Sequence, residues 1–145
     1  MIKAIGAEDY MSKNPLTFSE DTDLFEAIHL LLERKLTGAT VVNDKQEVVG
    51  VISEIDCLKA ILDGAYYGQV GGTVGQFMTR EVQAIEYIED HDILDIAKMM
   101  LDGKRRRIPV VTDGKFRGQV SARSILQAVK DFVANHDPSE DSSFE

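Results

Sequence analysis

A seven-residue pattern occurs twice in this chain, at residues 50–56 and 118–124. Each copy begins with a glycine and has a serine at its fourth position, and the two glycines are 68 positions apart. Other landmarks recur at offsets of 67 to 69, among them Val41-Val42 with Val110-Val111. A period this long, present twice, predicts two similar supersecondary units. A solenoid would need more copies to bury a continuous core.

The first copy predicts the end of a strand and the start of a helix. Ser53 can cap that helix, whose free amide N–H groups then point at an anion such as a phosphate. Asp56 lies one turn further on and can accept two hydrogen bonds from a diol such as ribose. An ordinary capped junction with a solvated aspartate is the alternative. Because the pattern is repeated, we interpret it as half of a nucleotide pocket.

Length and composition exclude several classes of protein. With 145 residues and 43% apolar content, the chain can bury one ordinary core or two small half-domains packed on each other. The net charge of −9 argues against sequence-independent nucleic-acid binding and against an anionic membrane surface. No apolar run reaches membrane-spanning length, and the first residues lack the apolar core of a signal peptide. The single cysteine, Cys57, fits a reducing compartment, so we expect a cytoplasmic protein.

Hydrophobic periodicity predicts the order β-α-β-β-α in each repeat, and hence an α+β fold. In the first repeat the expected elements are an extended piece at 16–18, a helix that is capped by Asp21 or Thr22 and stops no later than Gly38, strands at 39–42 and 48–52, and a helix at 54–63 that Gly64 ends. In the second they are an extended piece at 82–85, a helix capped by Asp90, strands at 108–111 and 116–120, and a helix at 121–134. We expect Ile55, Leu58 and the pair Ile61-Leu62 to face the core.

These elements divide the chain into two repeats and three connecting or terminal segments. The segments are an N-terminal arm at 1–9, the first repeat at 10–63, a glycine-rich linker at 64–75, the second repeat at 76–134 and an acidic tail at 135–145.

The repeats resemble the cystathionine-β-synthase (CBS) domain, and their pairing resembles a stand-alone Bateman module. The resemblance covers roughly residues 10–130. It rests on the order and spacing of several motifs, which are Met11-Ser12 before Asn14-Pro15, 37–42, 50–56, 77–79, 107–111 and 118–124. It implies two packed repeats and a regulatory, non-catalytic module. Such modules bind an adenosine compound, such as AMP, ADP, ATP or S-adenosylmethionine, in clefts between the repeats. No cofactor is required, and the regulated partner is not implied.

The resemblance also implies which residues bind the ligand. In the first pocket these are Thr17, Phe18, Gly38, Ala39, Thr40, Ser53 and Asp56, with Ser53 on the phosphate, Asp56 on the ribose, and the backbone of 38–40 along the base. In the second they are Ala84, Ile85, Arg107, Ile108, Pro109 and Ser121, with Ser121 on the phosphate. The second pocket departs from the family because Ser124 replaces the ribose-binding aspartate. A neutral serine makes a weaker hydrogen bond than a carboxylate, so we expect one strong and one weak site.

The basic run at 104–107 has three interpretations. It is a solvated helix end, a nucleic-acid patch, or a phosphate clamp that uses Arg105 or Arg107. Arg107 adjoins the strand entry of the second pocket, which favours the clamp.

Two other classes of function compete with a nucleotide-binding module. An enzyme lacks support, because the three histidines show no metal or triad spacing and neither repeat has a phosphate-binding loop of the Walker type. A dimerisation or interaction module with empty, vestigial clefts is the other. We expect a homodimer in either case, with contacts from the helices at 54–63 and 121–134 and from the turn around Met78.

Overall fold

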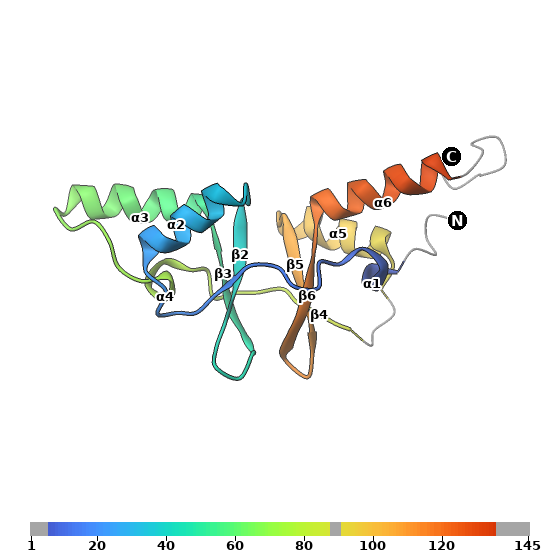
Figure 1. Cartoon of the computed structure of the whole chain (residues 1–145), viewed down its shortest axis with the longest axis horizontal. Coiled ribbons are helices and arrows are strands. Elements are labelled where there is room, and N and C mark those ends of the chain that lie inside the picture. Colours follow the sequence, from blue (N-terminus) through green and yellow to red (C-terminus); the bar gives the residue numbers. More distant parts are fainter. Residues whose placement is uncertain (1–5, 88–90, 136–145) are drawn as a thin grey trace. The chain divides into compact units, whose positions relative to one another are not determined.

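The computed structural model describes residues 6–87 and 91–135, which form two compact units. Unit 2 consists of residues 15–82 and 114–116. Of the described residues, unit 1 contains 6–14, 83–87, 91–113 and 117–135. Figure 1 shows that each unit contains the main elements of one repeat, in the predicted order β-α-β-β-α.

Unit 2 combines a three-stranded sheet with three helices. Its elements are β1 (Thr17–Phe18), α2 (Leu24–Glu33), β2 (Gly38–Val42), β3 (Val48–Ser53), α3 (Glu54–Tyr66) and the short α4 (Val74–Phe77). β2 is the central strand, parallel to β1 and antiparallel to β3. All five residues of β2 are buried, as its continuous apolar character predicts.

The core of unit 2 lies between this sheet and the helices α2 and α3. Buried side chains from all of these elements form one cluster, which includes Phe18, Leu24, Ala27, Leu31, Val41, Ile52, Cys57 and Ala60. Burying a large apolar side chain contributes about 1.5–3 kcal/mol, so this cluster is the main source of stability of the unit.

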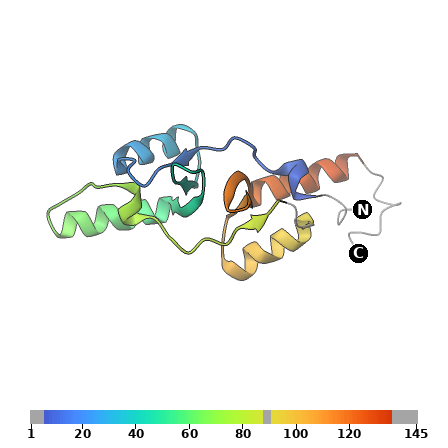
Figure 2. The ribbon, with the colours of Figure 1, turned by 90° about the horizontal axis from the view of Figure 1, so that it is seen from below.

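Unit 1 repeats the arrangement. Its elements are α1 (Ala7–Tyr10), β4 (Ile85–Glu86), α5 (Ile93–Gly103), β5 (Arg107–Thr112), β6 (Lys115–Ser121) and α6 (Ala122–Ala134), except that the first two residues of β6 belong to unit 2. β4 is parallel to β5 with Ile85 opposite Val110, as Phe18 is opposite Val41. Figure 2 shows α1 beside α6, and Tyr10 of α1 packs against a buried cluster of Ile93, Ala128 and Phe132.

The segment that opens each repeat in the sequence packs in the unit of the other repeat. Met11 belongs to the core of unit 1, whereas Met78 belongs to the core of unit 2. Ser12 exchanges two backbone hydrogen bonds with Gln119, at 2.8 and 3.0 Å, and Thr79 exchanges two with Val51, at 2.8 and 2.9 Å. The units therefore do not coincide with the sequence repeats. Met78 is only 8% exposed, so its side chain is not available for the dimer contact expected from the sequence.

Several predicted helix ends were wrong. Helix α2 is capped by Asp23 and not by Asp21 or Thr22, because the Asp23 carboxylate accepts the N–H groups of Phe25 and Glu26 at 3.0 and 3.2 Å. Helix α3 continues past Gly64 to Tyr66.

Two further boundaries differ in the second repeat. Asp92 caps α5, and the expected cap Asp90 lies outside the described residues. The extended piece expected at 82–85 is the two-residue strand β4, Ile85–Glu86, because only these residues pair with β5.

The orientation predicted for α3 was also wrong, except at Ile61, which is partly buried and packs against the core of unit 2. Ile55, Leu58 and Leu62 are 66%, 65% and 70% exposed, and the helix buries Cys57 and Ala60 instead. Small side chains let α3 pack closely on the sheet, whereas the larger apolar side chains lie on its outer face. Helical periodicity reveals an apolar stripe, but it does not say whether that stripe meets the core or another surface.

Helices α2 and α5 are each followed by a lysine with a left-handed backbone, Lys35 (φ 56°) and Lys104 (φ 53°). This conformation costs a non-glycine residue roughly 1–2 kcal/mol. We expect Lys35→Gly to raise the free energy of unfolding by roughly 0.5–1 kcal/mol in urea denaturation, since glycine relieves the strain but adds freedom to the unfolded chain. Arg34→Gly, one residue earlier at φ −90°, is the control and should not stabilise. Equal effects of the two changes would contradict the strain at Lys35.

Candidate functional site

Ser53 and Asp56 form a reciprocal cap at the start of α3. The Ser53 Oγ accepts the Asp56 N–H at 3.1 Å, and the Asp56 Oδ2 accepts the Ser53 N–H at 2.9 Å. The prediction that Ser53 caps this helix is confirmed. The arrangement also fixes the carboxylate beside the serine hydroxyl, which the sequence did not reveal.

The sheet brings the other first-pocket residues to the same end of unit 2. Gly38, which starts β2, is opposite Ser53, and Thr17 is opposite Thr40. The side chains of the remaining three residues are almost fully inside the unit, with exposed fractions of 4% for Phe18, 1% for Ala39 and 0% for Thr40. A ligand at this end can therefore reach those three residues only through their backbone.

The start of α3 offers fewer free amides than the sequence suggested. The Glu54 N–H donates to the Thr37 carbonyl at 2.9 Å, and the Asp56 N–H donates to Ser53. Ile55 is the second residue of α3, so its N–H has no partner within the helix and can donate to an anion. Within the described part of the chain the Ser53 Oγ acts only as an acceptor, so its hydroxyl hydrogen can still be donated. The Ser53 hydroxyl and the Ile55 N–H are thus candidate donors for a phosphate at this cap.

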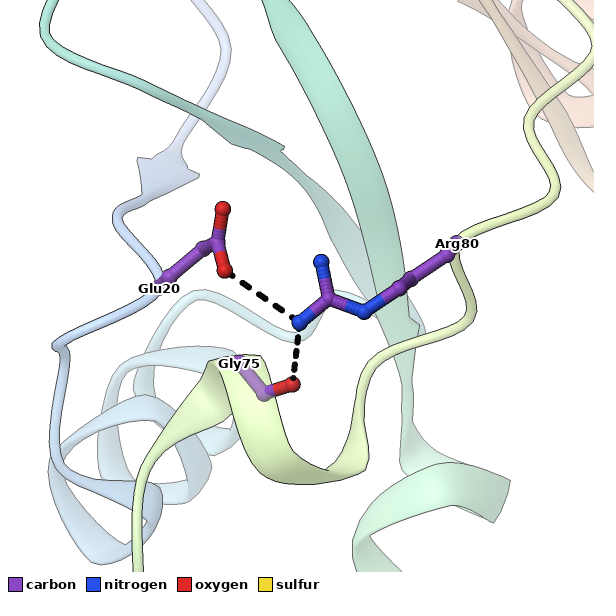
Figure 3. Close-up of polar contacts among 3 residues, drawn as sticks. All are labelled: Glu20, Gly75 and Arg80. Atoms are coloured by element: carbon purple, nitrogen blue, oxygen red, sulfur yellow. Dashed lines mark hydrogen bonds and ion pairs between the residues drawn. The ribbon is translucent and has the colours of Figure 1, made fainter.

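Thr79 is a neighbour of Asp56 that the sequence interpretation missed. Its Oγ1 lies 3.4 Å from each carboxylate oxygen of Asp56. The next residue, Arg80, donates to the Glu20 carboxylate at 3.2 Å and to the Gly75 carbonyl at 3.0 Å, which holds this segment in place (Figure 3). Met78-Thr79 repeats Met11-Ser12 at an offset of 67, and this match was the available signal, but it assigned Thr79 to the second repeat.

The equivalent cap in unit 1 is formed by two serines. Ser124 and Ser121 exchange the same pair of backbone-to-side-chain hydrogen bonds, at 2.9 and 3.0 Å. The Ser124 hydroxyl also donates to the Ser121 carbonyl at 2.9 Å. Ser124 therefore uses its hydroxyl inside the cap and offers no carboxylate to a diol.

The other second-pocket residues lie at the matching end of the sheet in unit 1. Ile108 and Pro109 are buried in β5, Ile85 is buried in β4, and Ala84 precedes it. Arg107 begins β5 and is half-buried. Arg105 lies two residues earlier, where its side chain passes Gly103 near Gln83. These residues thus lie at positions of unit 1 that correspond to those of the first-pocket residues in unit 2, and their role in binding a ligand stays a prediction.

Cys57, next to Asp56, is not a reactive thiol. Burial raises the pKa of the Cys57 thiol, and the carboxylates of Asp56 and Glu54 raise this pKa further. The thiol stays protonated at neutral pH and packs as a small apolar side chain. Among residues 6–87 and 91–135, no group of three or more His, Cys, Asp or Glu side chains could hold a metal ion. Within the same residues, no helix has both the length and the apolar character needed to cross a membrane.

Comparison with curated proteins finds several relatives. The chain is 30% identical over 129 residues to the uncharacterised protein MJ1225 of Methanocaldococcus jannaschii, a match that covers 88% of this chain and 44% of that protein. It is 28% identical over 133 residues to the chloroplastic CBS domain-containing protein CBSX1 of Arabidopsis thaliana, covering 74% of this chain and 56% of CBSX1. The chain thus spans about half the length of these two relatives.

Solved structures share the fold. The crystal structure of CBSX2 in complex with AMP matches with a TM-score of 0.77 at 27% identity, over 89% of this chain and 98% of that one. The CBS domain pair of protein MJ0100, in complex with 5-methylthioadenosine and S-adenosyl-L-methionine, matches with a TM-score of 0.75 at 24% identity, over 88% and 97% of the two chains. The CBS domain family matches the sequence twice, over residues 7–63 and 74–131. The chain therefore belongs to the CBS domain family, as a tandem pair of these domains.

Proposed function

We propose that the chain is a regulatory module that senses an adenosine nucleotide and signals its presence to a separate protein. AMP is the preferred ligand in this proposal, ahead of ADP, ATP and S-adenosylmethionine. The nucleotide binds in unit 2, with its phosphate on the Ser53 hydroxyl and its ribose on the Asp56 carboxylate. The module has no catalytic role and acts in the cytoplasm as a homodimer.

One observation carries this proposal, namely the reciprocal cap of Ser53 and Asp56. It holds a hydroxyl donor and a carboxylate acceptor within one helical turn, and both side chains are only half-buried. Asp56 keeps acceptor capacity, because the contacts with the Thr79 hydroxyl are long and weak, at 3.4 Å. A ribose hydroxyl can replace that contact with a shorter one to a charged acceptor. The AMP complex of CBSX2, 27% identical over nearly its whole length, supports AMP as the ligand.

The main alternative is an interaction module whose nucleotide sites are vestigial. The second site, taken by itself, fits a vestigial site, because the Ser124 hydroxyl is already hydrogen-bonded within its own cap. The first site does not, because it retains the carboxylate. Nucleotide titration separates the two functions, since a vestigial module binds no adenosine compound.

Calorimetric titration with AMP should therefore give about one strong site per chain. The second site, which includes Ala84, Arg107, Pro109 and Ser121, should bind roughly tenfold more weakly, since a hydrogen bond to a carboxylate is about 1.4 kcal/mol stronger than one to a neutral serine. Replacing Ser124 by aspartate should strengthen this second site. Two equally strong sites in the unmodified chain would contradict the role given to Asp56, and the absence of any binding would favour the vestigial module.

A further inference from the structure

Thr79 follows α4 in the sequence, and its backbone is fixed on strand β3. The Thr79 N–H donates to the Val51 carbonyl at 2.8 Å, and the Thr79 carbonyl accepts the Val51 N–H at 2.9 Å. Gly50 lets the segment come this close, because a Cβ atom there would lie 2.8 Å from the Thr79 carbonyl oxygen. Arg80, the next residue, adds the two hydrogen bonds drawn in Figure 3. The position of the Thr79 side chain beside α3 is therefore set by backbone contacts and does not depend on a ligand.

The hydroxyl of Thr79 lies at the same distance, 3.4 Å, from both carboxylate oxygens of Asp56. An ordinary hydrogen bond between two oxygen atoms is about 2.5–3.0 Å long, so neither contact is strong. Within the part of the chain that the structure describes, these two oxygens are the only hydrogen-bond partners of the Thr79 side chain. A threonine hydroxyl has one hydrogen to donate and two lone pairs to accept with. Most of this capacity is thus unused, next to the acceptor proposed for the ribose.

The Asp56 carboxylate also has capacity left. Its Oδ2 accepts the Ser53 N–H at 2.9 Å, whereas its Oδ1 has no contact shorter than 3.4 Å among the described residues. A ribose hydroxyl that donates to Oδ1 would lie about 2.7–2.8 Å from it. Because the Thr79 Oγ1 is only 3.4 Å from the same oxygen, that ribose hydroxyl can also lie within hydrogen-bond distance of Thr79. It would then use its hydrogen on Asp56 and accept the hydrogen of Thr79.

We infer that Thr79 is a ribose-binding residue of the first site, and that it donates to the same ribose hydroxyl that donates to Asp56. The inference rests on the proposed function and adds a residue that determines specificity for ribose over a deoxy sugar. The weak contact between Thr79 and Asp56 is then replaced by two shorter hydrogen bonds through the ligand. Because the backbone of Thr79 is already fixed, little further ordering is needed when the ligand binds.

Unit 1 supplies a matched control. Ser12 exchanges two backbone hydrogen bonds with Gln119, as Thr79 does with Val51, and both Ser12 and Thr79 are exposed. The cap beside it carries Ser124, whose hydroxyl donates to the Ser121 carbonyl. A ribose hydroxyl therefore finds no carboxylate in that cap, and removal of the Ser12 hydroxyl should not change binding at the first site.

Calorimetric titration of the full chain with AMP tests the inference. Thr79→Val replaces the hydroxyl by a methyl group of similar size and should weaken AMP about 3- to 10-fold, the loss of one neutral hydrogen bond. Thr79→Ser keeps the hydroxyl and should stay within about twofold of the unmodified chain. Ser12→Ala should leave the affinity of the strong site unchanged. Thermal melting shows whether each variant is folded, and Thr79→Ala takes the place of Thr79→Val if that variant unfolds.

Titration with 2′-deoxy-AMP and 3′-deoxy-AMP separates a direct contact from a role in orienting Asp56. A direct contact involves one ribose hydroxyl, so Thr79→Val should weaken one of these two ligands 3- to 10-fold and leave the other nearly unchanged. A threonine that only orients the carboxylate would weaken both ligands when replaced, and that result would overturn the inference.

The same titrations distinguish a failure of this inference from a failure of the proposed function. If Asp56→Ala weakens AMP but a folded Thr79→Val variant binds it as the unmodified chain does, the inference is wrong and the proposed function stands. If the unmodified chain binds no AMP, both are wrong.

Discussion

Replacing Asp56 by alanine is expected to weaken AMP binding by about 10- to 100-fold, because a ribose diol loses its charged acceptor. Adenosine should lose affinity by a similar factor, since it contains the same ribose. 2′-Deoxy-AMP should already bind the unmodified chain weakly, and Asp56→Ala should reduce its affinity by a smaller factor than it reduces that of AMP. Calorimetry with the three ligands measures these ratios.

Ser53→Ala is the matched comparison, because it removes the other half of the same cap. It should weaken the binding free energy of AMP by roughly 1.5–3 kcal/mol. The affinity for adenosine should hardly change, since adenosine has no phosphate. Each variant also loses one capping hydrogen bond, which costs on the order of 1 kcal/mol of stability and is checked by thermal melting. If Asp56→Ala leaves the AMP affinity of a folded protein unchanged, the nucleotide does not bind at this cap.

Replacing Gly118 by alanine is expected to lower the free energy of unfolding by about 2–3 kcal/mol. A Cβ atom at this position would collide with the backbone carbonyl of Ser12, the residue that pairs with Gln119 in unit 1. Backbone cannot move aside as a side chain can, so the paired segment must shift. Urea denaturation measures the loss.

Gly103→Ala is the control, since it also adds a methyl group to a glycine of unit 1. There the Cβ would approach side-chain atoms and not backbone, namely the Gln83 Oε1 at 3.2 Å and the Arg105 Nε at 3.3 Å, and Gly103 is the last residue of α5. We expect little change or a small stabilisation from better helix propensity. An unchanged stability of Gly118→Ala would show that Ser12 does not pack against this glycine in solution.

Gly50 shows why glycine begins both copies of the repeated pattern. A Cβ atom there would lie 2.7 Å from the Met78 sulfur and 2.8 Å from the Thr79 carbonyl oxygen. In each unit the glycine thus makes room for the segment that opens the other repeat. The sequence revealed the two glycines and the two opening segments, but not that they meet, because the residues in contact are 28 positions apart in one unit and 106 in the other.

The sequence by itself determined the elements of the fold and the local chemistry of the first site. The order β-α-β-β-α follows from hydrophobic periodicity and turn residues, and the Ser53 cap follows from side-chain and backbone groups three residues apart. These are short-range interactions, which a single chain segment specifies.

Only the tertiary structure decided which surfaces meet. The opening segment of each repeat packs in the unit of the other repeat, and Thr79 lies beside Asp56. Leu58 faces outward, whereas Cys57 and Ala60 pack on the sheet. Each of these outcomes depends on contacts between residues distant in sequence. Burial of an apolar side chain of α3 stabilises by a similar free energy whether it is buried in the core or against another surface. Periodicity therefore predicts that α3 has an apolar stripe, and only the packing shows which way that stripe faces.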